Sequence, residues 1–162
     1  MTGTAAMEMK GREAARSTGT HRVATLLLAT DLGEASEAAT EHAIALAAQL
    51  RARLLIVTVM DARPHLGPRP RPVEERERLS EALHMVGARA RHAGATTSFL
   101  VWDGDPAESI IAAASAEGAD MIVVGSHRRG TMGRAILGSV SDRVVREAVC
   151  PVLVVPSGRL PG

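Results

Sequence analysis

Aromatic side chains are nearly absent from this sequence. Phe99 and Trp102 are the only phenylalanine, tryptophan or tyrosine residues in a chain of 162. Proteins that bind single-stranded nucleic acid stack bases on aromatic rings, and this chain has almost none to offer. The net charge of +1 also provides no general field that would attract nucleic acid or an acidic membrane surface. We therefore expect neither nucleic acid nor a membrane among its partners.

Lysine is equally scarce. Lys10 is the only lysine among 19 basic residues, and it precedes the first hydrophobic run. A Walker phosphate-binding loop needs a lysine directly after its second glycine to contact the phosphates. Gly133 and Gly138 have the glycine spacing of such a loop, but Ser139 stands where the lysine belongs. The lysine of protein kinases is missing for the same reason. Any nucleotide must therefore be held by another kind of loop.

Cysteine and long apolar runs are lacking too. Cys150 is the single cysteine, which excludes an intramolecular disulfide and a cysteine-based zinc cluster. No apolar run reaches the roughly 18 residues that a membrane-spanning helix needs. The N-terminal residues also lack the apolar core of a secretory signal. These absences predict a soluble, cytoplasmic protein.

What the sequence does contain is a regular alternation of hydrophobic runs and amphipathic segments. The runs are typical of strands buried on both faces of a parallel sheet, and they cover residues 23–29, 53–61, 96–102, 120–126 and 151–156. Helical spacing of apolar residues fills the segments between them. This order predicts the α/β class: one Rossmann-like domain with an open five-stranded parallel sheet, strand order 3-2-1-4-5, and helices on both faces.

Glycine and proline set the expected limits of these elements. Four of the eight prolines lie in residues 62–72, so this segment is expected to be a loop. The sequence "DGDP" at residues 103–106 predicts a turn, and its Asp105 followed by proline predicts the start of a helix. Gly94 and Gly118 are expected to end helices. We expect an extension over residues 1–21, a domain over 22–157 and a tail over 158–162.

Candidate ligand-binding residues lie where the first and fourth strands end. In an open parallel sheet a ligand binds at the carboxyl ends of the strands, at the point where the strand order reverses. Asp31 follows the first strand, where it suits either a ribose or cation contact or a simple turn with Gly33. Gly125 ends the fourth strand. Ser139 and Asp142 match a capping box at the last helix, which serves either as a plain cap or as one side of an anion site.

Four segments resemble the universal stress protein family. They are "ATD" after the first strand, "GDPAESI" at residues 104–110, "ADMIVVGSH" at 119–127, and "ILGSVSDRVVREAVCPVLVV" at 136–155. The resemblance extends over residues 22–156 and implies the fold shared with the adenine-nucleotide alpha-hydrolases. The ATP-binding branch of this family carries the motif Gly-x2-Gly-x9-Gly-Ser/Thr. The first and third glycines correspond to Gly125 and Gly138, and the second position is Arg128.

The resemblance also implies a ligand and the residues that bind it. ATP, with Mg²⁺ on its phosphates, is the expected cofactor, and homodimerisation through the last strand, Pro151 to Pro156, is the expected assembly. Asp31 would contact the ribose, and Val59 would face the adenine. The remaining expected site residues line the pocket (Ala29, Thr30, Val124), belong to the glycine loop (Gly125, Arg128, Gly130) or hold the phosphates (Gly138, Ser139, Val140, Ser141).

Arg128 is the one departure from the motif. A non-glycine residue in a left-handed conformation costs roughly 1–2 kcal/mol, and a bidentate guanidinium–phosphate contact recovers about as much. We expect binding, since every other motif position is kept. Three hypotheses follow: a nucleotide-binding stress-response regulator with little turnover, a slow ATPase or phosphotransferase, and a nucleotide-free dimeric module in which Arg128 closes the loop. Only Asp31 and His127 offer a base for the second.

Overall fold

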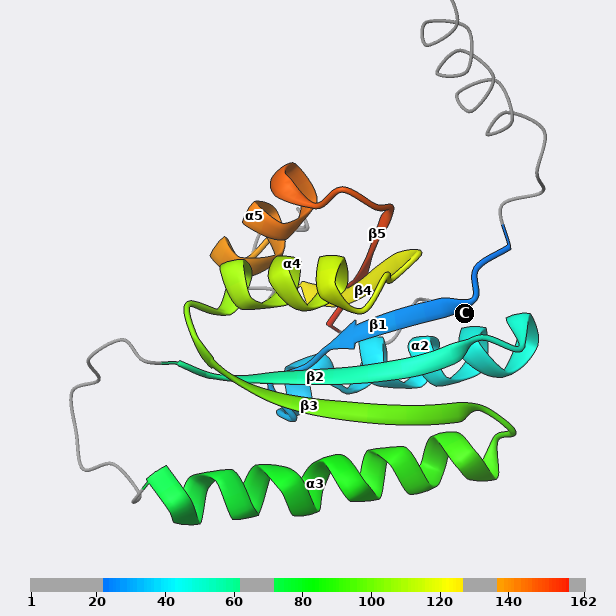
Figure 1. Ribbon diagram of the computed structural model, residues 1–162, viewed down its shortest axis with the longest axis horizontal. Helices are drawn as coiled ribbons and strands as arrows, with labels where there is room; N and C mark the ends of the chain where they lie inside the picture. The colour runs from blue at the N-terminus through cyan, green and yellow to red at the C-terminus, as the bar shows by residue number, and fades with distance from the viewer. Residues whose placement is uncertain (1–21, 62–71, 127–136, 158–162) are drawn as a thin grey trace, which may run out of the picture.

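The structure is a computed structural model that describes residues 22–61, 72–126 and 137–157. Five strands and the helices between them make up this part of the chain (Figure 1). In chain order the elements are β1 (Thr25–Ala29), the 3-10 helix η2 (Glu34–Ser36), α2 (Glu37–Leu50), β2 (Arg53–Asp61), α3 (Pro72–His92), β3 (Thr96–Gly104), α4 (Pro106–Ala116), β4 (Met121–Ser126), α5 (Ser139–Glu147) and β5 (Val152–Pro156).

All five strands form one parallel sheet in the order β3-β2-β1-β4-β5. The predicted fold class and strand order are therefore confirmed. The reversal of order lies at β1, because the chain adds β2 and β3 on one side of this strand and β4 and β5 on the other. β1 is the most deeply buried strand, with Leu26, Leu27 and Leu28 fully enclosed.

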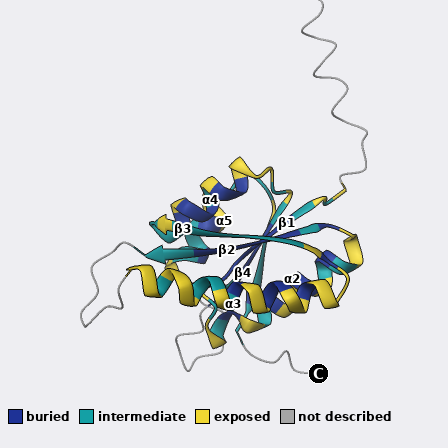
Figure 2. Cartoon of the chain, turned by 60° about the horizontal axis from the view of Figure 1, so that its bottom comes forward, coloured by how far each residue is buried: buried dark blue, intermediate teal, exposed yellow. Residues whose placement is uncertain are grey.

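Alternate residues of the strands supply two separate cores, one on each face of the sheet. Leu26, Leu28 and Ile56 pack against α2 and α3. Leu27 and Leu55 point to the opposite face, where they pack against α4 and α5. Figure 2 shows the buried residues of the helices turned toward the sheet between them. Because side chains on a strand alternate between faces with a period of two, each hydrophobic run supplies both cores, as expected of a parallel sheet.

The observed limits of the elements agree with the sequence in most places. Asp105 caps α4 by accepting a hydrogen bond from the backbone N–H of Glu108 at 3.0 Å. Gly94 and Gly118 follow α3 and α4 with φ angles of +91° and +62°, a region that favours glycine. Within the expected loop 62–72, Pro72 is instead the first residue of α3, a position that suits proline because its missing N–H has no helical acceptor there.

The turn predicted over residues 103–106 is wrong for its first half. Asp103 and Gly104 belong to β3, where they pair with Met60 and Asp61 of β2. The long β2 provides backbone partners up to Asp61, and this pairing holds the two residues in the strand. The chain turns only at Asp105. The predicted divisions of the chain at residues 21 and 157 stay a prediction.

Candidate functional site

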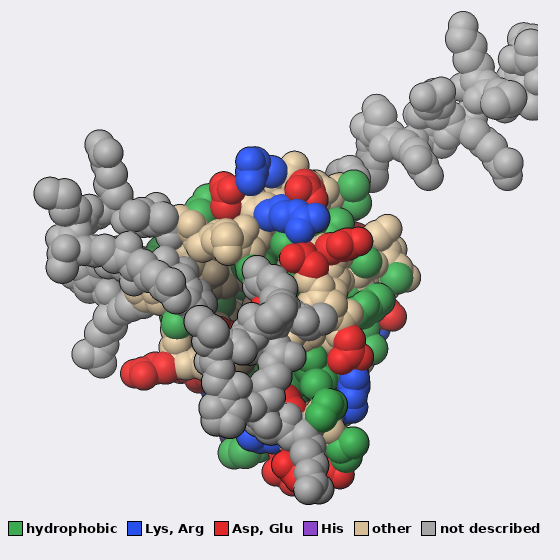
Figure 3. All heavy atoms as spheres, turned by 90° about the vertical axis from the view of Figure 1, so that its left-hand side faces the viewer, with side chains coloured by type: hydrophobic (Ala, Val, Ile, Leu, Met, Phe, Trp, Pro, Cys, Tyr) green, Lys and Arg blue, Asp and Glu red, His purple; other side chains and the backbone are tan. Residues whose placement is uncertain are grey.

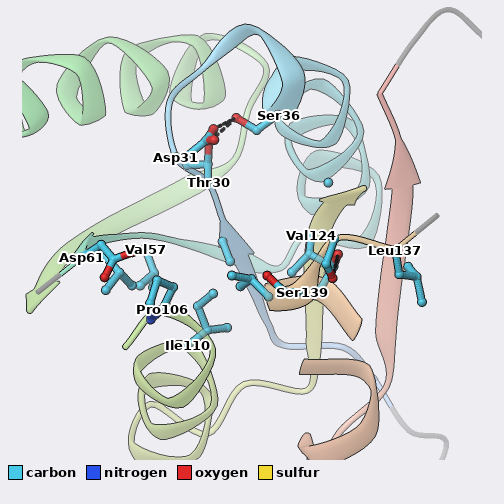
Figure 4. A pocket seen from close by; sticks show the side chains of 16 residues that line it. Thr30, Asp31, Ser36, Val57, Asp61, Pro106, Ile110, Val124, Leu137 and Ser139 are labelled. Atoms are coloured by element: carbon cyan, nitrogen blue, oxygen red, sulfur yellow. Dashed lines mark hydrogen bonds between the residues drawn. The ribbon is translucent and has the colours of Figure 1, made fainter. Parts of the chain in front are cut away.

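A cavity of about 530 Å³ lies at the carboxyl edge of the sheet, where β1, β2 and β4 end (Figure 4). The first residues of α4 and α5 form its other wall. The side chains and backbone that line it come from Ala29, Thr30, Asp31, Ser36, Val57, Val59, Asp61, Pro106, Ile110, Val124, Gly125, Leu137, Gly138, Ser139, Val140 and Ser141. The reversal of strand order thus coincides with a hollow large enough for a small ligand.

A network of short hydrogen bonds holds the Asp31 carboxylate at one side of the cavity. Its Oδ1 accepts from the backbone N–H of Gly33 at 2.9 Å and from the hydroxyl of Ser36 at 2.7 Å. The Thr30 hydroxyl lies 2.9 Å from that of Ser36 and accepts from the backbone N–H of Leu32 at 3.0 Å. Leu32 itself has a φ of +60°, an unusual conformation for a branched residue. The two roles considered for Asp31, turn formation and ligand contact, are therefore compatible, since Asp31 both begins the turn and lines the cavity.

Apolar side chains form the part of the cavity next to β2 and α4. Val57 and Val59 come from alternate positions of β2, and Pro106 and Ile110 come from one face of the first turns of α4. Val57 is fully buried and Ile110 nearly so. Such a wall suits the flat, largely apolar face of a ring system. Asp61, at the end of β2, adds a carboxylate at the edge of this wall.

The N-terminus of α5 forms the other polar part of the cavity. Gly138 precedes the helix in an extended conformation, with φ −64° and ψ 159°. The backbone N–H of Asp142 donates to the carbonyl of Gly138 at 2.9 Å, which closes the first helical turn. The N–H groups of the three residues before Asp142 therefore have no carbonyl within the helix to bond. Together with the positive end of the helix dipole, they favour an anion in the cavity.

The capping box predicted for Ser139 and Asp142 is wrong. Gly138 occupies the cap position, so Ser139 is already the first helical residue. Asp142 bonds to Arg146 one turn later, at 2.8 Å, instead of returning to the start of the helix. At the start of α5 the hydroxyl that makes a backbone hydrogen bond is that of Ser141, which donates to the carbonyl of Gly138 at 3.1 Å.

Arg143 joins the two helices that border the cavity. Its guanidinium contacts Asp105 at 2.9 Å, the cap of α4, and Glu147 at 3.1 Å within α5. The hydrogen bond and charge of Glu147 raise the pKa of Arg143 above its usual value, so the guanidinium keeps its charge. This ion pair links the start of α4 to the first turns of α5.

The charged residues of the described lining, Asp31 and Asp61, are both acidic, whereas the surrounding face carries both signs of charge. On the face that shows the carboxyl edge of the sheet, basic and acidic side chains of the described residues lie next to one another instead of gathering by sign (Figure 3). No group of three or more histidine, cysteine, aspartate or glutamate residues within the described ranges could hold a metal ion. The described helices also include none long and apolar enough to cross a membrane.

Comparison with known proteins identifies the family. A profile of the universal stress protein family matches residues 23–156. The chain belongs to the universal stress protein family. A universal stress protein of Thermus aquaticus is 37% identical to it over 139 residues, which cover 81% of this chain and 97% of the relative. A second, from Methanocaldococcus jannaschii, is 33% identical over 136 residues and 80% of each chain. A solved universal stress protein in complex with cAMP superposes with a TM-score of 0.67 at 26% identity, over 85% of this chain and 99% of that one.

Ten residues of the expected site in this universal stress protein come together around one cavity. They are Ala29, Thr30, Asp31, Val59, Val124, Gly125, Gly138, Ser139, Val140 and Ser141. Arg128 and Gly130, and with them His127, lie outside the described residues. The structure therefore gathers the ten expected residues from the ends of β1, β2 and β4 and from the start of α5.

Six lining residues were not predicted from the sequence of this universal stress protein: Ser36, Val57, Asp61, Pro106, Ile110 and Leu137. Val57 and Asp61 share the face and end of β2 with Val59, so the period-two pattern of the strand could have identified them. Pro106 and Ile110 begin the helix that follows β3, and the crossover rule places that helix over β2. Ser36 lies after a turn and gave no pattern to follow.

Proposed function

We propose that this universal stress protein binds ATP, with Mg²⁺ on the phosphates, and acts as a nucleotide-dependent stress-response regulator. The observation that carries the proposal is the cavity itself, which combines an apolar wall, a fixed carboxylate and the start of α5 in about 530 Å³. Adenine, ribose and phosphate need these three surfaces in this order. A universal stress protein of 26% identity in complex with cAMP supports an adenine nucleotide as the class of ligand.

Each part of the ligand has a matching part of the cavity. The adenine would lie against Val59, and the ribose would lie within reach of Asp31. The phosphates would meet the amides of Ser139 to Ser141 at the start of α5. Mg²⁺ is commonly bound through substrate phosphates and few protein ligands. In this proposal the ion would be held mainly by the phosphates, with the carboxylates of Asp31 and Asp61 at the same cavity.

Pairing of two copies through β5 completes the proposal. β5 ends the strand order, so the outer edge of this strand has no neighbour within the described sheet. Exposed edges favour pairing with another strand. Val145 of α5 and Val149, which lies between α5 and β5 in the chain, are 42% and 85% exposed. We propose a homodimer at this edge.

Calorimetric titration of the full chain with ATP and Mg²⁺ tests nucleotide binding. We expect saturable binding by the wild type and a loss of roughly tenfold to a hundredfold in Asp31→Ala, because hydrogen bonds to a charged group are worth about 1.5–3 kcal/mol. Glu34→Ala is the matched control. It removes the same charge nearby, from a residue of η2 that does not line the cavity.

The other two hypotheses predict different results in the same assay. Binding seen only after Arg128→Gly would mean that the arginine closes the loop, and it would favour the nucleotide-free module. Phosphate release by the wild type that is lost in Asp31→Ala would favour slow hydrolysis. Equal binding by the wild type and Asp31→Ala would contradict the proposed site.

A further inference from the structure

Ser36 lies beside Asp31 and lines the cavity, although the residue is only 5% exposed. It stands at the N-cap position of α2, where a serine hydroxyl usually accepts a hydrogen bond from the helix backbone. Here it makes no such bond. The helix has no need of it, because η2 leads directly into α2 and the N–H of Glu37 donates to the carbonyl of Glu34. The hydroxyl turns instead toward Asp31 (Figure 4).

Counting protons gives the direction of the bonds around Ser36. A serine hydroxyl has one proton to donate and can also accept. The ionised carboxylate of Asp31, at 2.7 Å, is the nearest acceptor and the only charged one; the carbonyl of Gly33, at 2.9 Å, already accepts from the backbone N–H of Ser36. Hydrogen bonds to a charged acceptor are the stronger ones, so the Ser36 hydroxyl donates its proton to the hydrogen bond with Asp31.

Thr30 completes the chain of hydroxyls. Its oxygen accepts from the N–H of Leu32, so its own proton is available to Ser36 at 2.9 Å. The order Thr30 to Ser36 to Asp31 then satisfies each donor. Thr30 and Ser36 are both buried, at 7% and 5% exposed, whereas Asp31 is exposed at the cavity. Two buried hydroxyls thus fix one oxygen of a carboxylate that faces the ligand.

We propose that Ser36 is a positioning residue that makes the site selective for nucleotides with free ribose hydroxyls. This inference rests on the proposed function. Ser36 acts through Asp31: it holds the carboxylate in one orientation, so that the 2′- and 3′-hydroxyls of a ribose find an acceptor already in place. Preorganised acceptors lose less entropy on binding, and a site built to bond a hydroxyl disfavours a ligand that lacks it.

Titration of the full chain with ATP and with 2′,3′-dideoxy-ATP, both with Mg²⁺, tests this role. The wild type is expected to bind ATP more tightly than the dideoxy analogue. Ser36→Ala is expected to weaken ATP binding roughly threefold to tenfold, the worth of one net hydrogen bond, and to change binding of the analogue little. The ratio of the two affinities therefore falls. Thr30→Val should change the ratio in the same direction by a smaller factor.

Ser109→Ala is the matched control, because Ser109 is also 5% exposed but lies in α4 and does not line the cavity. It should leave the ratio unchanged. If Ser36→Ala lowers both affinities equally, or neither, Ser36 is a structural residue and this inference fails alone. If the wild type binds neither nucleotide, the proposed function fails and this inference with it.

Discussion

Gly33 also limits where the carboxylate of Asp31 can lie. A Cβ atom added to Gly33 would lie 3.2 Å from Oδ1 of Asp31, closer than a side chain normally approaches. The φ of Gly33 is −88°, a value that any residue adopts, so alanine brings no backbone strain. The conflict is confined to the carboxylate, which must move by a few tenths of an ångström.

Gly33→Ala is therefore expected to weaken ATP binding without destabilising the fold. Displacing the carboxylate should cost up to about one hydrogen bond, roughly twofold to tenfold in affinity. Stability should stay level or rise by about 0.4–1 kcal/mol, because alanine restricts the unfolded chain. Calorimetric titration and urea denaturation of the same preparation measure the two effects.

Gly125→Ala is the comparison for this prediction. Its Cβ atom would lie 3.5 Å from Cα of Ser36 and 3.7 Å from Cβ of Ala39, which are ordinary contacts. It would point toward η2 and α2, away from the start of α5. Although Gly125 lines the cavity through its backbone, the added side chain would not enter it, so we expect ATP affinity within about twofold of the wild type. A larger loss than in Gly33→Ala would contradict this prediction.

At the scale of elements, Asp105 carries two contacts that can be separated. Its Oδ1 accepts from the N–H of Glu108, which caps α4, and from the guanidinium of Arg143, which joins α4 to α5. Asparagine keeps the oxygen and loses the charge, whereas alanine loses both. The cap is worth about 1 kcal/mol, and a solvent-exposed ion pair is worth about 0–1 kcal/mol.

Asp105→Ala is expected to lower the free energy of unfolding by about 1–2 kcal/mol, and Asp105→Asn by less than about 1 kcal/mol. Urea denaturation of the two variants measures the difference. Equal losses in both would mean that the bond to Arg143, and not the cap, stabilises this junction. ATP affinity should fall in both variants, since the starts of α4 and α5 border the cavity.

The elements also show which features of the fold the sequence could predict. The hydrophobic runs identified all five strands. β1 is buried along most of its length and has no charged position to obscure its run, whereas β3 was identified from its apolar residues although none of them is fully buried. Cap and glycine signals identified the ends of α3 and α4. The end of β3 was missed because it depends on pairing with β2, a contact that residues 103–104 do not encode locally. The cap of α5 was misassigned by one residue, because Ser139 and Gly138 both suit that position.

The residues that line the candidate site also include some that the sequence could predict and some that it could not. Strand ends and the family motif predicted ten lining residues, since topology alone brings the ends of β1, β2 and β4 together. Ser36 was missed because its place beside Asp31 depends on η2. This single helical turn between β1 and α2 is too short to produce a periodic pattern in the sequence. Positions set by local backbone geometry were therefore the hardest to predict.

At the scale of the whole molecule, the proposed dimer can be tested through the backbone of β5. Pro151 O accepts from the N–H of Ile122, and the N–H of Ser157 donates to Ser126 O. Backbone groups alternate along a strand, so the N–H groups of Val152 and Val154 point away from β4. Pro156 has the same outward position, where a missing N–H costs the sheet nothing.

Val154→Pro is therefore expected to remove a donor from the outer edge and leave the pairing with β4 intact. Sedimentation velocity should show a shift from dimer to monomer. Val154→Ala is the control, because it shortens the side chain but keeps the N–H, and it should remain dimeric. A Val154→Pro protein that folds and still forms the wild-type dimer would place the interface elsewhere.

The two sides of the cavity come from opposite ends of the described fold. Asp31 and Ser36 follow the first strand, whereas Gly138 to Ser141 come after β4. Between them in the chain lie α2, β2, α3, β3, α4 and β4. During synthesis the early side exists long before the late side has been made. If the proposed nucleotide binds here, it would have no complete site on a partly made chain. It would stabilise the domain only after α5 has docked, so occupancy of the cavity would report that the early and late parts of the fold have come together.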